Sequence, residues 1–294
     1  MLILLRPDTH SCGGRTTAYL HAGRADAPLA LLLHGFPDTP HSWNPLAEGL
    51  VEAGFRVVAP WLRGYAPSSP AAGDDHGPSS HVRDVAALAQ VMGADEHTLL
   101  IGHDIGAAIA YAAALRHPDL FGRVVTLSVP PPAALSAVMT SYAQLKRSWY
   151  TFAFQHPAAE ELIVADNFAF LRGLWTDWSP RLDPTPHLDH LRAALPDREH
   201  LSAALGWYRA MFQPNPSDQA LATEQSAAGG RVPKPWLYLH GTDDGCVGAE
   251  VLQYVPGGVP LHGVGHFPQL EAPREVLLHL RKFLESDSGT SVGD

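Results

Sequence analysis

The stretch that decides the fold runs Leu99-Leu-Ile-Gly-His-Asp104-Ile-Gly-Ala107. Its order predicts a buried strand, a tight turn centred on Asp104, and a helix. A residue in so sharp a turn needs small neighbours two positions before and after it, which Gly102 and Gly106 supply. The turn exposes the Asp104 side chain beside the free N–H groups of the helix start. Asp104 is therefore a candidate nucleophile, and the alternative is that it only caps the helix.

Similar apolar runs occur on both sides of this stretch. Five such runs end at Gly, Pro or Ser and are typical of buried strands: Leu29–His34, Phe55–Ala59, His97–Gly102, Val124–Ser128 and Trp236–His240. Residues 81–92 have apolar side chains at helical spacing, and residues 105–116 are rich in alanine. Alternating strands and helices predict an α/β fold with a mostly parallel central sheet flanked by helices.

Residues 133–230 break this alternation. They are rich in aromatic residues, contain no buried-strand run, and carry prolines between segments of helical character. We interpret them as a helical insertion between two strands of the sheet. Residues 219–231 at its end are polar and include Gly229 and Gly230, which favours a return linker.

Composition limits the possible partners. The chain has 294 residues with a formal charge of −10, and 46% of its residues are hydrophobic, so it can bury a real core. The densest basic cluster is Lys146-Arg147, so we expect no nucleic-acid partner and no anionic membrane surface. No apolar run reaches the length of a membrane-spanning helix.

The N-terminal segment and the cysteines indicate the cellular compartment that we expect for the protein. Leu2–Leu5 is too short for the apolar core of a signal peptide, and Cys12 and Cys246 do not form a disulfide scaffold. We therefore expect a cytoplasmic protein. The tail Ser286–Asp294 is expected to be disordered.

Backbone amides near Asp104 provide a second chemical feature. His34-Gly-Phe-Pro37 closes a predicted strand with a tight turn, which a cis peptide bond at Pro37 would suit. The amides of Phe36 and Ile105 are placed to form an oxyanion hole.

A third feature lies near the C-terminal end. Gly241-Thr-Asp243-Asp244 follows a predicted strand, and Gly265-His266-Phe267 lies in a glycine-rich loop before the last helix. The chain order is therefore nucleophile, acid and base, with Asp104, Asp244 or Asp243, and His266. An Asp nucleophile that attacks an sp³ carbon gives an alkyl ester that water can hydrolyse, so epoxides and alkyl halides are the expected electrophiles.

Over about residues 28–285 the sequence resembles the α/β-hydrolase superfamily, and within it the epoxide-hydrolase-like group. The matching pieces are residues 34–37, Arg63-Gly-Tyr65 with Ser68, residues 102–106, Gly241 with Asp244, and residues 265–267. The resemblance implies an α/β-hydrolase core at residues 1–131 and 232–294 and a helical cap at residues 132–231. It favours Asp244 over Asp243 as the acid.

The resemblance also implies an activity. Two cap tyrosines of this group bind and protonate the epoxide oxygen, and the segments 148–157 and 204–209 match theirs, which points to Tyr150 and Tyr208. The expected substrate is a small apolar epoxide, with water as the second reactant. We expect no metal and no cofactor, and a homodimer is compatible with this assignment. Ile105 departs from the Trp found in many relatives.

Two other functions share these features. One is a haloalkane or haloacid dehalogenase of the same fold, although Phe36 and Ile105 lack the side-chain donors that bind halide in those enzymes. The other is a non-catalytic relative that binds a small ligand, which has no need of both the triad and the tyrosines.

Other polar residues are interpreted as structural. His187 and His190, with His200, lack the spacing of a helical metal site. His103 is expected to support the fold rather than act as a base. Cys246, near the predicted acid, is expected to be a small packing residue.

Overall fold

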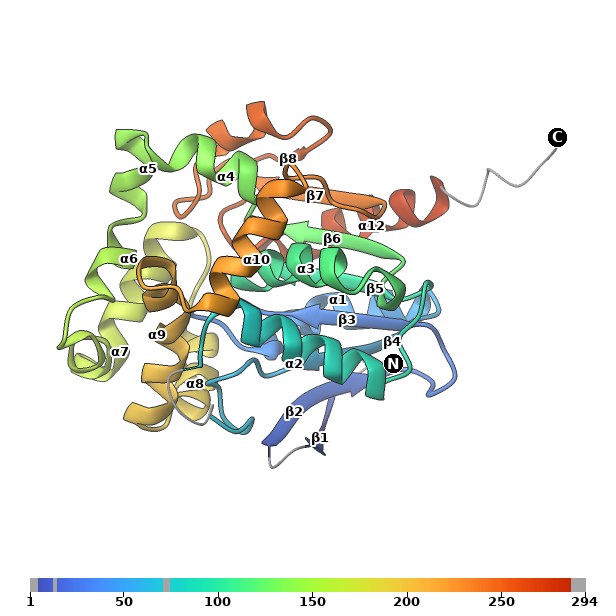
Figure 1. Ribbon diagram of the computed structural model, residues 1–294, viewed down its shortest axis with the longest axis horizontal. Helices are drawn as coiled ribbons and strands as arrows, with labels where there is room; N and C mark the ends of the chain where they lie inside the picture. The colour runs from blue at the N-terminus through green and yellow to red at the C-terminus, as the bar shows by residue number, and fades with distance from the viewer. Residues whose placement is uncertain (1–4, 13–14, 71–74, 287–294) are drawn as a thin grey trace, which may run out of the picture.

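One eight-stranded sheet organises the molecule, as the computed structural model shows (Figure 1). The structure describes residues 5–12, 15–70 and 75–286. Apart from Leu5 and Ser286, the N-terminal run and the C-terminal tail discussed above lie outside the described residues. The strand order is β1-β2-β4-β3-β5-β6-β7-β8. The expectation of a mostly parallel α/β sheet is confirmed.

The five strands predicted from apolar runs form the centre of this sheet. They are β3 (Leu29–Leu33), β4 (Arg56–Pro60), β5 (Leu99–His103), β6 (Arg123–Leu127) and β7 (Trp236–Gly241). All neighbouring pairs among them are parallel. β3 and β5 are buried along their whole length, which explains why their sequences are apolar without alternation.

Three further strands lie toward the edges of the sheet and were not predicted. β1 (Arg6–Cys12) and β2 (Arg15–Ala22) pair antiparallel with each other, and β2 pairs antiparallel with β4. β8 (Val259–Leu261) is three residues long and parallel to β7. β1 reads Arg-Pro-Asp-Thr-His-Ser-Cys, so it carries no apolar run that would reveal a strand.

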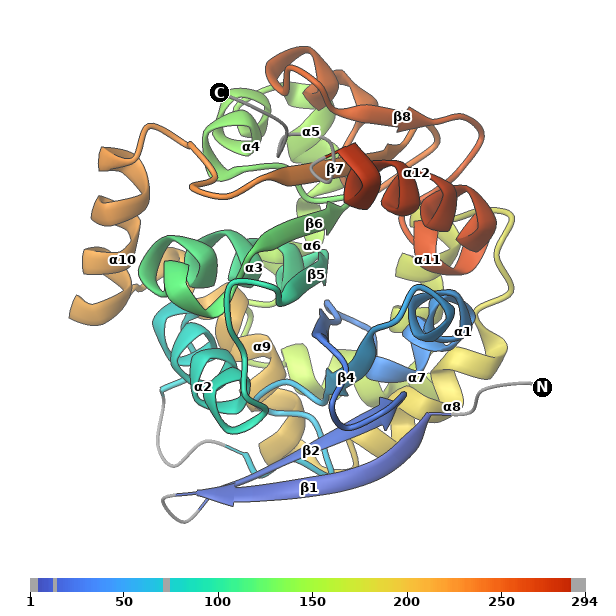
Figure 2. The ribbon, with the colours of Figure 1, turned by 90° about the vertical axis from the view of Figure 1, so that its right-hand side faces the viewer.

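Helices cover both faces of the sheet (Figure 2). α2 (Pro78–Val91) and α3 (Ile105–Arg116) lie on one face, and α1 (Asn44–Glu52) and α12 (Pro273–Ser286) lie on the other. The short α11 (Pro268–Glu271) packs beside α12. The 3-10 helices η1 (Pro40–Trp43), η2 (Pro118–Leu120) and η3 (Ala249–Tyr254) complete the connections. α3 is buried on nearly every side because its alanines let it approach β3, β5 and β6 closely.

Residues 132–231, here called the inserted segment, are helical as expected. Their helices are α4 (Pro132–Met139), α5 (Tyr142–Arg147), α6 (Trp149–Ala153), α7 (Ala159–Trp178), α8 (Thr185–Ala194), α9 (Arg198–Phe212) and α10 (Pro216–Ala227). α7 is interrupted at residues 165–168, where the backbone leaves the helical conformation. In Figure 1, α5 to α9 gather beyond one end of the sheet.

The prediction of a return linker at residues 219–231 was wrong for most of its length. Residues 216–227 form α10, which packs against α2 and α3 (Figure 2). The helix buries only Asp218 and Leu221. So narrow a buried face leaves the sequence polar, which is why the pattern resembled a linker.

No helix within the described part of the chain combines the length and apolar character needed to cross a bilayer.

Candidate active site

The turn between β5 and α3 holds Asp104 as the sequence predicts. Asp104 has φ 53° and ψ −121°, a conformation that costs a non-glycine residue of order 1–3 kcal/mol. A Cβ atom on Gly102 would overlap the backbone of Gly106, and one on Gly106 would overlap the carbonyl oxygen of Leu33. The two glycines are therefore required by close backbone approach. Asp104 itself is 4% exposed.

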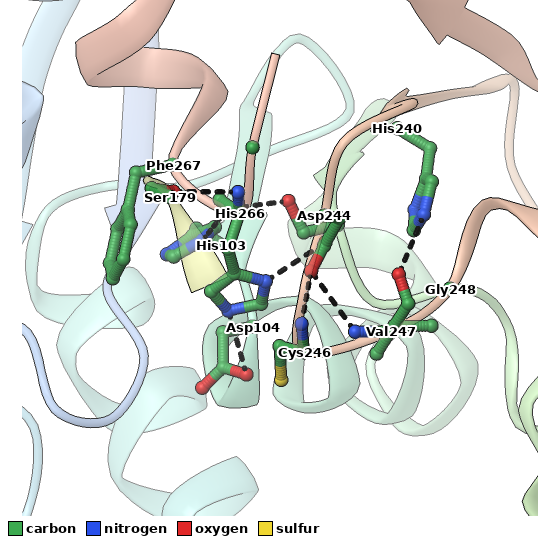
Figure 3. A network of polar contacts seen from close by, with 12 residues as sticks. His103, Asp104, Ser179, His240, Asp244, Cys246, Val247, Gly248, His266 and Phe267 are labelled. Carbon is green, nitrogen blue, oxygen red and sulfur yellow. Dashed lines mark hydrogen bonds and ion pairs between the residues drawn. The ribbon is translucent and has the colours of Figure 1, made fainter. Parts of the chain in front are cut away.

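Two carboxylates flank the imidazole of His266 (Figure 3). Its Nδ1 lies 2.9 Å from Oδ2 of Asp244, and its Nε2 lies 3.4 Å from Oδ2 of Asp104. The other oxygen of Asp244 accepts hydrogen bonds from the amides of Cys246 at 2.7 Å and Val247 at 3.0 Å. Asp244 is thus fixed on both oxygens and orients the imidazole toward Asp104.

Asp243, the alternative acid, lies elsewhere. Its carboxylate pairs with Arg181 at 2.7 Å, and both side chains are largely exposed. The structure therefore brings Asp244, and not Asp243, to His266.

The backbone of His266 is held from both sides. Its amide donates to the Ser179 hydroxyl at 2.8 Å and to the carbonyl of Trp178 at 3.1 Å, both at the end of α7. Its carbonyl accepts hydrogen bonds from Ser128 Oγ at 2.7 Å and from His103 Nε2 at 2.8 Å. His103 therefore contacts the main chain of the loop rather than Asp104, in agreement with the supporting role expected for it.

Burial and charge act together on these groups. Burial alone would lower the pKa of His266, but the Asp244 charge and the hydrogen bonds to Asp104 and Asp244 raise it to about 10. Burial alone would raise the pKa of Asp104, yet His266, His103 and the Phe36 amide hold it below its usual value. The pKa of Asp244 is lowered against burial, mainly by His266. The resting site therefore holds two carboxylates around a protonated imidazole.

Backbone amides approach Asp104 where the sequence suggested. The Phe36 amide donates to Asp104 Oδ1 at 2.9 Å, and the Phe36–Pro37 peptide bond is cis. The Pro37 carbonyl in turn accepts a hydrogen bond from Trp175 Nε1 of α7 at 2.7 Å. Ile105 is the first residue of α3, where amides have no acceptor within the helix.

Tyr150 on α6 and Tyr208 on α9 face the same space as Asp104. Both are buried, with ring centroids 5.8 Å apart in an edge-to-face arrangement. They line a cavity of about 300 Å³ together with Asp104 and Ile105. The remaining wall is mostly apolar and includes Val129, Leu135, Met139, Trp207, Met211 and Val247. Burial raises the pKa of both tyrosines well above the ordinary value, so both hydroxyls keep their protons.

Cys246 is buried in the core, as expected of a packing residue, and it also lines the cavity. Its thiol faces the cavity, and Sγ lies 3.3 Å from the Tyr150 hydroxyl. The available signal was its position two residues after Asp244, because the amides of that turn bind the Asp244 carboxylate and direct the thiol toward His266.

Comparisons with known proteins agree with this architecture. The model of the alpha/beta hydrolase fold family matches residues 28–273. Epoxide hydrolase A of Mycobacterium tuberculosis is 30% identical, with 90% of this chain and 92% of that protein covered. An epoxide hydrolase of Caballeronia sordidicola is 29% identical, with 88% of each chain covered.

A solved structure has the same fold. The epoxide hydrolase from an endophytic Streptomyces superposes with a TM-score of 0.76 at 27% identity, and covers 96% of this chain and 95% of its own. The family match spans most of the chain, and the relatives extend over nearly all of it. The chain therefore belongs to the α/β-hydrolase fold family, as an epoxide-hydrolase-like hydrolase.

Proposed function

We propose that the protein hydrolyses an epoxide to a vicinal diol through a covalent ester on Asp104. The observation that carries this proposal is that one carboxylate and two tyrosines line the same mostly apolar cavity. A carboxylate can open an epoxide only if the departing oxygen receives a proton or strong hydrogen bonds. Tyr150 and Tyr208, which line the same cavity as Asp104, can supply both. The names of the relatives described above support the same substrate class.

Ring opening is the first step. Oδ2 of Asp104 attacks one ring carbon, the C–O bond breaks, and the released oxygen takes a proton from a tyrosine. Oδ1 keeps its hydrogen bond from the Phe36 amide and becomes the ester carbonyl oxygen. The turn at Asp104 holds the carboxylate rigidly before substrate arrives, which lowers the entropic cost of attack.

Ester formation then changes the charge around His266. The pKa of His266 is high because two carboxylates surround it, and esterification neutralises Asp104. His266 therefore releases its proton, which restores the tyrosine. The neutral imidazole can now act as a general base. The same carboxylate thus serves as nucleophile and, by losing its charge, prepares the base.

Hydrolysis of the ester completes the cycle. His266 removes a proton from a water molecule, whose oxygen attacks the ester carbonyl, while Asp244 stabilises the imidazolium. The amides of Phe36 and Ile105 stabilise the tetrahedral oxyanion. When the intermediate collapses, the ester C–O bond breaks and the departing oxygen takes the second proton of the attacking water, which gives the second hydroxyl of the diol and leaves Asp104 as a carboxylate and His266 as an imidazolium.

The inserted segment acts as the cap of this site. It contributes both tyrosines, and the end of α7 holds the His266 loop through Trp178 and Ser179. We accordingly assign residues 1–131 and 232–294 to the catalytic core and residues 132–231 to the cap.

The shape of the interior bears on substrate size. A second hollow of about 200 Å³ shares five lining residues with the first: Ala108, Val129, Leu135, Ser136 and Trp207. An apolar chain that reached this hollow would gain about 0.8 kcal/mol for each buried methylene. Alkyl epoxides of increasing chain length therefore belong in the substrate panel.

The test is diol formation from a panel of aryl and alkyl epoxides, with haloalkanes included to detect halide release. We expect diol from at least one epoxide, and none from Asp104→Ala, which removes the nucleophile but leaves the surrounding core intact. Halide release without diol formation would identify a dehalogenase instead. Tight binding without turnover would identify a ligand-binding relative, and diol formation by Asp104→Ala would exclude the nucleophile assigned here.

A further inference from the structure

Asp104 and Cys246 of the cavity wall and His266 behind it form a set of potential metal ligands that the proposed reaction does not use together. Among the described residues, only Asp104, Cys246 and His266 bring three ligand atoms from His, Cys, Asp or Glu within 4.8 Å of one another. All three side chains are buried. Figure 3 shows the Cys246 thiol and the Asp104 carboxylate on the side of His266 that Nε2 faces.

We propose that Asp104, Cys246 and His266 form a reversible inhibitory site for Zn²⁺ and similar soft divalent cations. Binding of the ion does not depend on the function proposed above, whereas the inhibition does. The ion is not a cofactor here, because it would occupy the nucleophile and the base.

The donor set suits zinc. Thiolate sulfur, imidazole nitrogen and carboxylate oxygen are its common protein ligands, at about 2.0–2.3 Å in tetrahedral geometry. That geometry places donor atoms about 3.3–3.8 Å apart. His266 Nε2 and Asp104 Oδ2 are already 3.4 Å apart. All three donor atoms lie within 4.8 Å of one another, so binding an ion requires the thiol to move closer to the other two donors. A tetrahedral ion held by three protein ligands keeps its fourth position for water.

The surroundings of His266 match a zinc ligand as well. Nδ1 contacts the Asp244 carboxylate, an arrangement that orients metal-binding histidines and strengthens them as donors. Nε2 is fully buried, and it faces the carboxylate of Asp104, the second proposed ligand, at 3.4 Å.

Metal binding requires a thiolate at Cys246 and an unprotonated Nε2 at His266. When Zn²⁺ binds, the protons carried by these two ligand atoms leave to solvent, and metal–nitrogen and metal–sulfur bonds form in their place. A coordinating thiol is deprotonated by the metal itself.

Metal binding is tested on the chelator-treated protein without substrate. Cadmium serves as the first probe, because a cadmium–thiolate bond absorbs in the near ultraviolet. The chain has two cysteines, so Cys12→Ser is the matched control for Cys246→Ser. We expect one cadmium equivalent with a thiolate band in the wild type and in Cys12→Ser, and no band in Cys246→Ser. A band that persists in Cys246→Ser, or its absence from the wild type, overturns the proposal.

Zinc calorimetry supplies the second measurement. Cys246→Ser and Asp104→Asn should each weaken zinc binding by about tenfold or more, and Asp244→Asn by about 10- to 100-fold through loss of orientation of the imidazole. Circular dichroism checks that each variant is folded. If Cys246→Ser is unfolded, Cys246→Ala replaces it in the zinc titration. Unchanged zinc affinity in the folded variants contradicts the site.

Inhibition is then measured with any epoxide that the wild type hydrolyses, each variant relative to its own activity without metal. Zinc should inhibit the wild type and Cys12→Ser, and EDTA should reverse the effect. Cys246→Ser should need about tenfold more zinc for the same fractional inhibition. If the cadmium band appears but no epoxide is hydrolysed, the function proposed above fails and the metal site stands. If hydrolysis occurs and zinc leaves it unchanged, the inhibitory role fails.

Discussion

Three structural features fix the position of Asp104. Its backbone is held at positive φ, its Oδ1 accepts the Phe36 amide, and its Oδ2 faces His266. Each constraint has a sequence origin: the glycines around it, the turn at Phe36–Pro37, and the loop at His266. A strained and buried carboxylate costs stability, so its persistence here is consistent with a functional role.

The two tyrosines can be tested separately from the nucleophile. Tyr150→Phe combined with Tyr208→Phe keeps both rings but removes the hydroxyls that we propose stabilise the departing oxygen. We expect the rate of ester formation in single-turnover experiments to fall by about 10²–10⁴-fold, and each single substitution to have a smaller effect. Tyr111→Phe is the matched control, because its buried hydroxyl binds Thr126 within the core. If the double variant forms the ester as fast as the wild type, the two hydroxyls have no role in ring opening and both tyrosines are packing residues.

At this scale, much of the candidate site followed from the sequence. Asp104 and His266 lie in glycine-rich turns whose spacing is informative, and they are brought together as predicted. The choice between Asp244 and Asp243 required either the family resemblance or the structure, since adjacent carboxylates in a loop have no distinguishing pattern. Cys246 is buried as a packing residue would be, but its place beside the cavity could not be predicted, because a single cysteine carries no periodic signal and its orientation depends on the turn that binds Asp244.

Elements differed in how well the sequence revealed them. Strands buried on both faces, such as β3 and β5, appear as continuous apolar runs and were predicted to within about two residues. β1 was missed because an edge strand has solvent-exposed residues and gains its stability from pairing. β2 lies between β1 and β4, and it was missed because only part of it is buried, so it contains no long apolar run. α10 was missed because a helix that buries two side chains has almost no apolar periodicity.

The packing of α10 gives a stability test. Leu221 is 1% exposed on the face of α10 that meets α2 and α3. Leu221→Ala should lower the free energy of unfolding by about 2–5 kcal/mol, because it leaves a cavity under the helix. The exposed neighbour Thr223→Ala should change it by less than about 0.5 kcal/mol. Urea denaturation measures both, and equal small effects would mean that residues 216–227 act as a loose linker.

The molecule as a whole joins two parts at one site. The core supplies Asp104, Asp244 and His266 from the sheet and its loops, and the inserted segment supplies the tyrosines and the contacts of α7 with the His266 loop. Alternating strands and helices predicted the core. The aromatic, proline-divided composition predicted that the insertion is helical, but not how its helices pack, because those contacts join residues far apart in the sequence.

The ion pairs of His266 with Asp104 and Asp244 also affect the stability of the whole protein. Folding raises the pKa of His266 from 6.5 to about 10, so the folded chain keeps a proton that the unfolded chain loses in this interval. This contribution to stability is complete below pH 6.5 and is lost as the pH rises toward about 10. The free energy of unfolding should therefore fall over that range, and fall less in His266→Gln. Urea denaturation at both ends of the range checks this, and identical pH dependence in the two proteins would contradict it.

The covalent ester is tested most directly by mass spectrometry of His266→Gln after incubation with an epoxide that the wild type hydrolyses. In the proposed mechanism, ester formation needs Asp104 and the tyrosines, whereas hydrolysis of the ester needs His266. We predict that the variant gains the mass of one substrate molecule, located on the peptide that contains Asp104, and that Asp104→Asn/His266→Gln gains none. An unmodified variant, or a substrate mass on a different residue, would contradict Asp104 as the nucleophile.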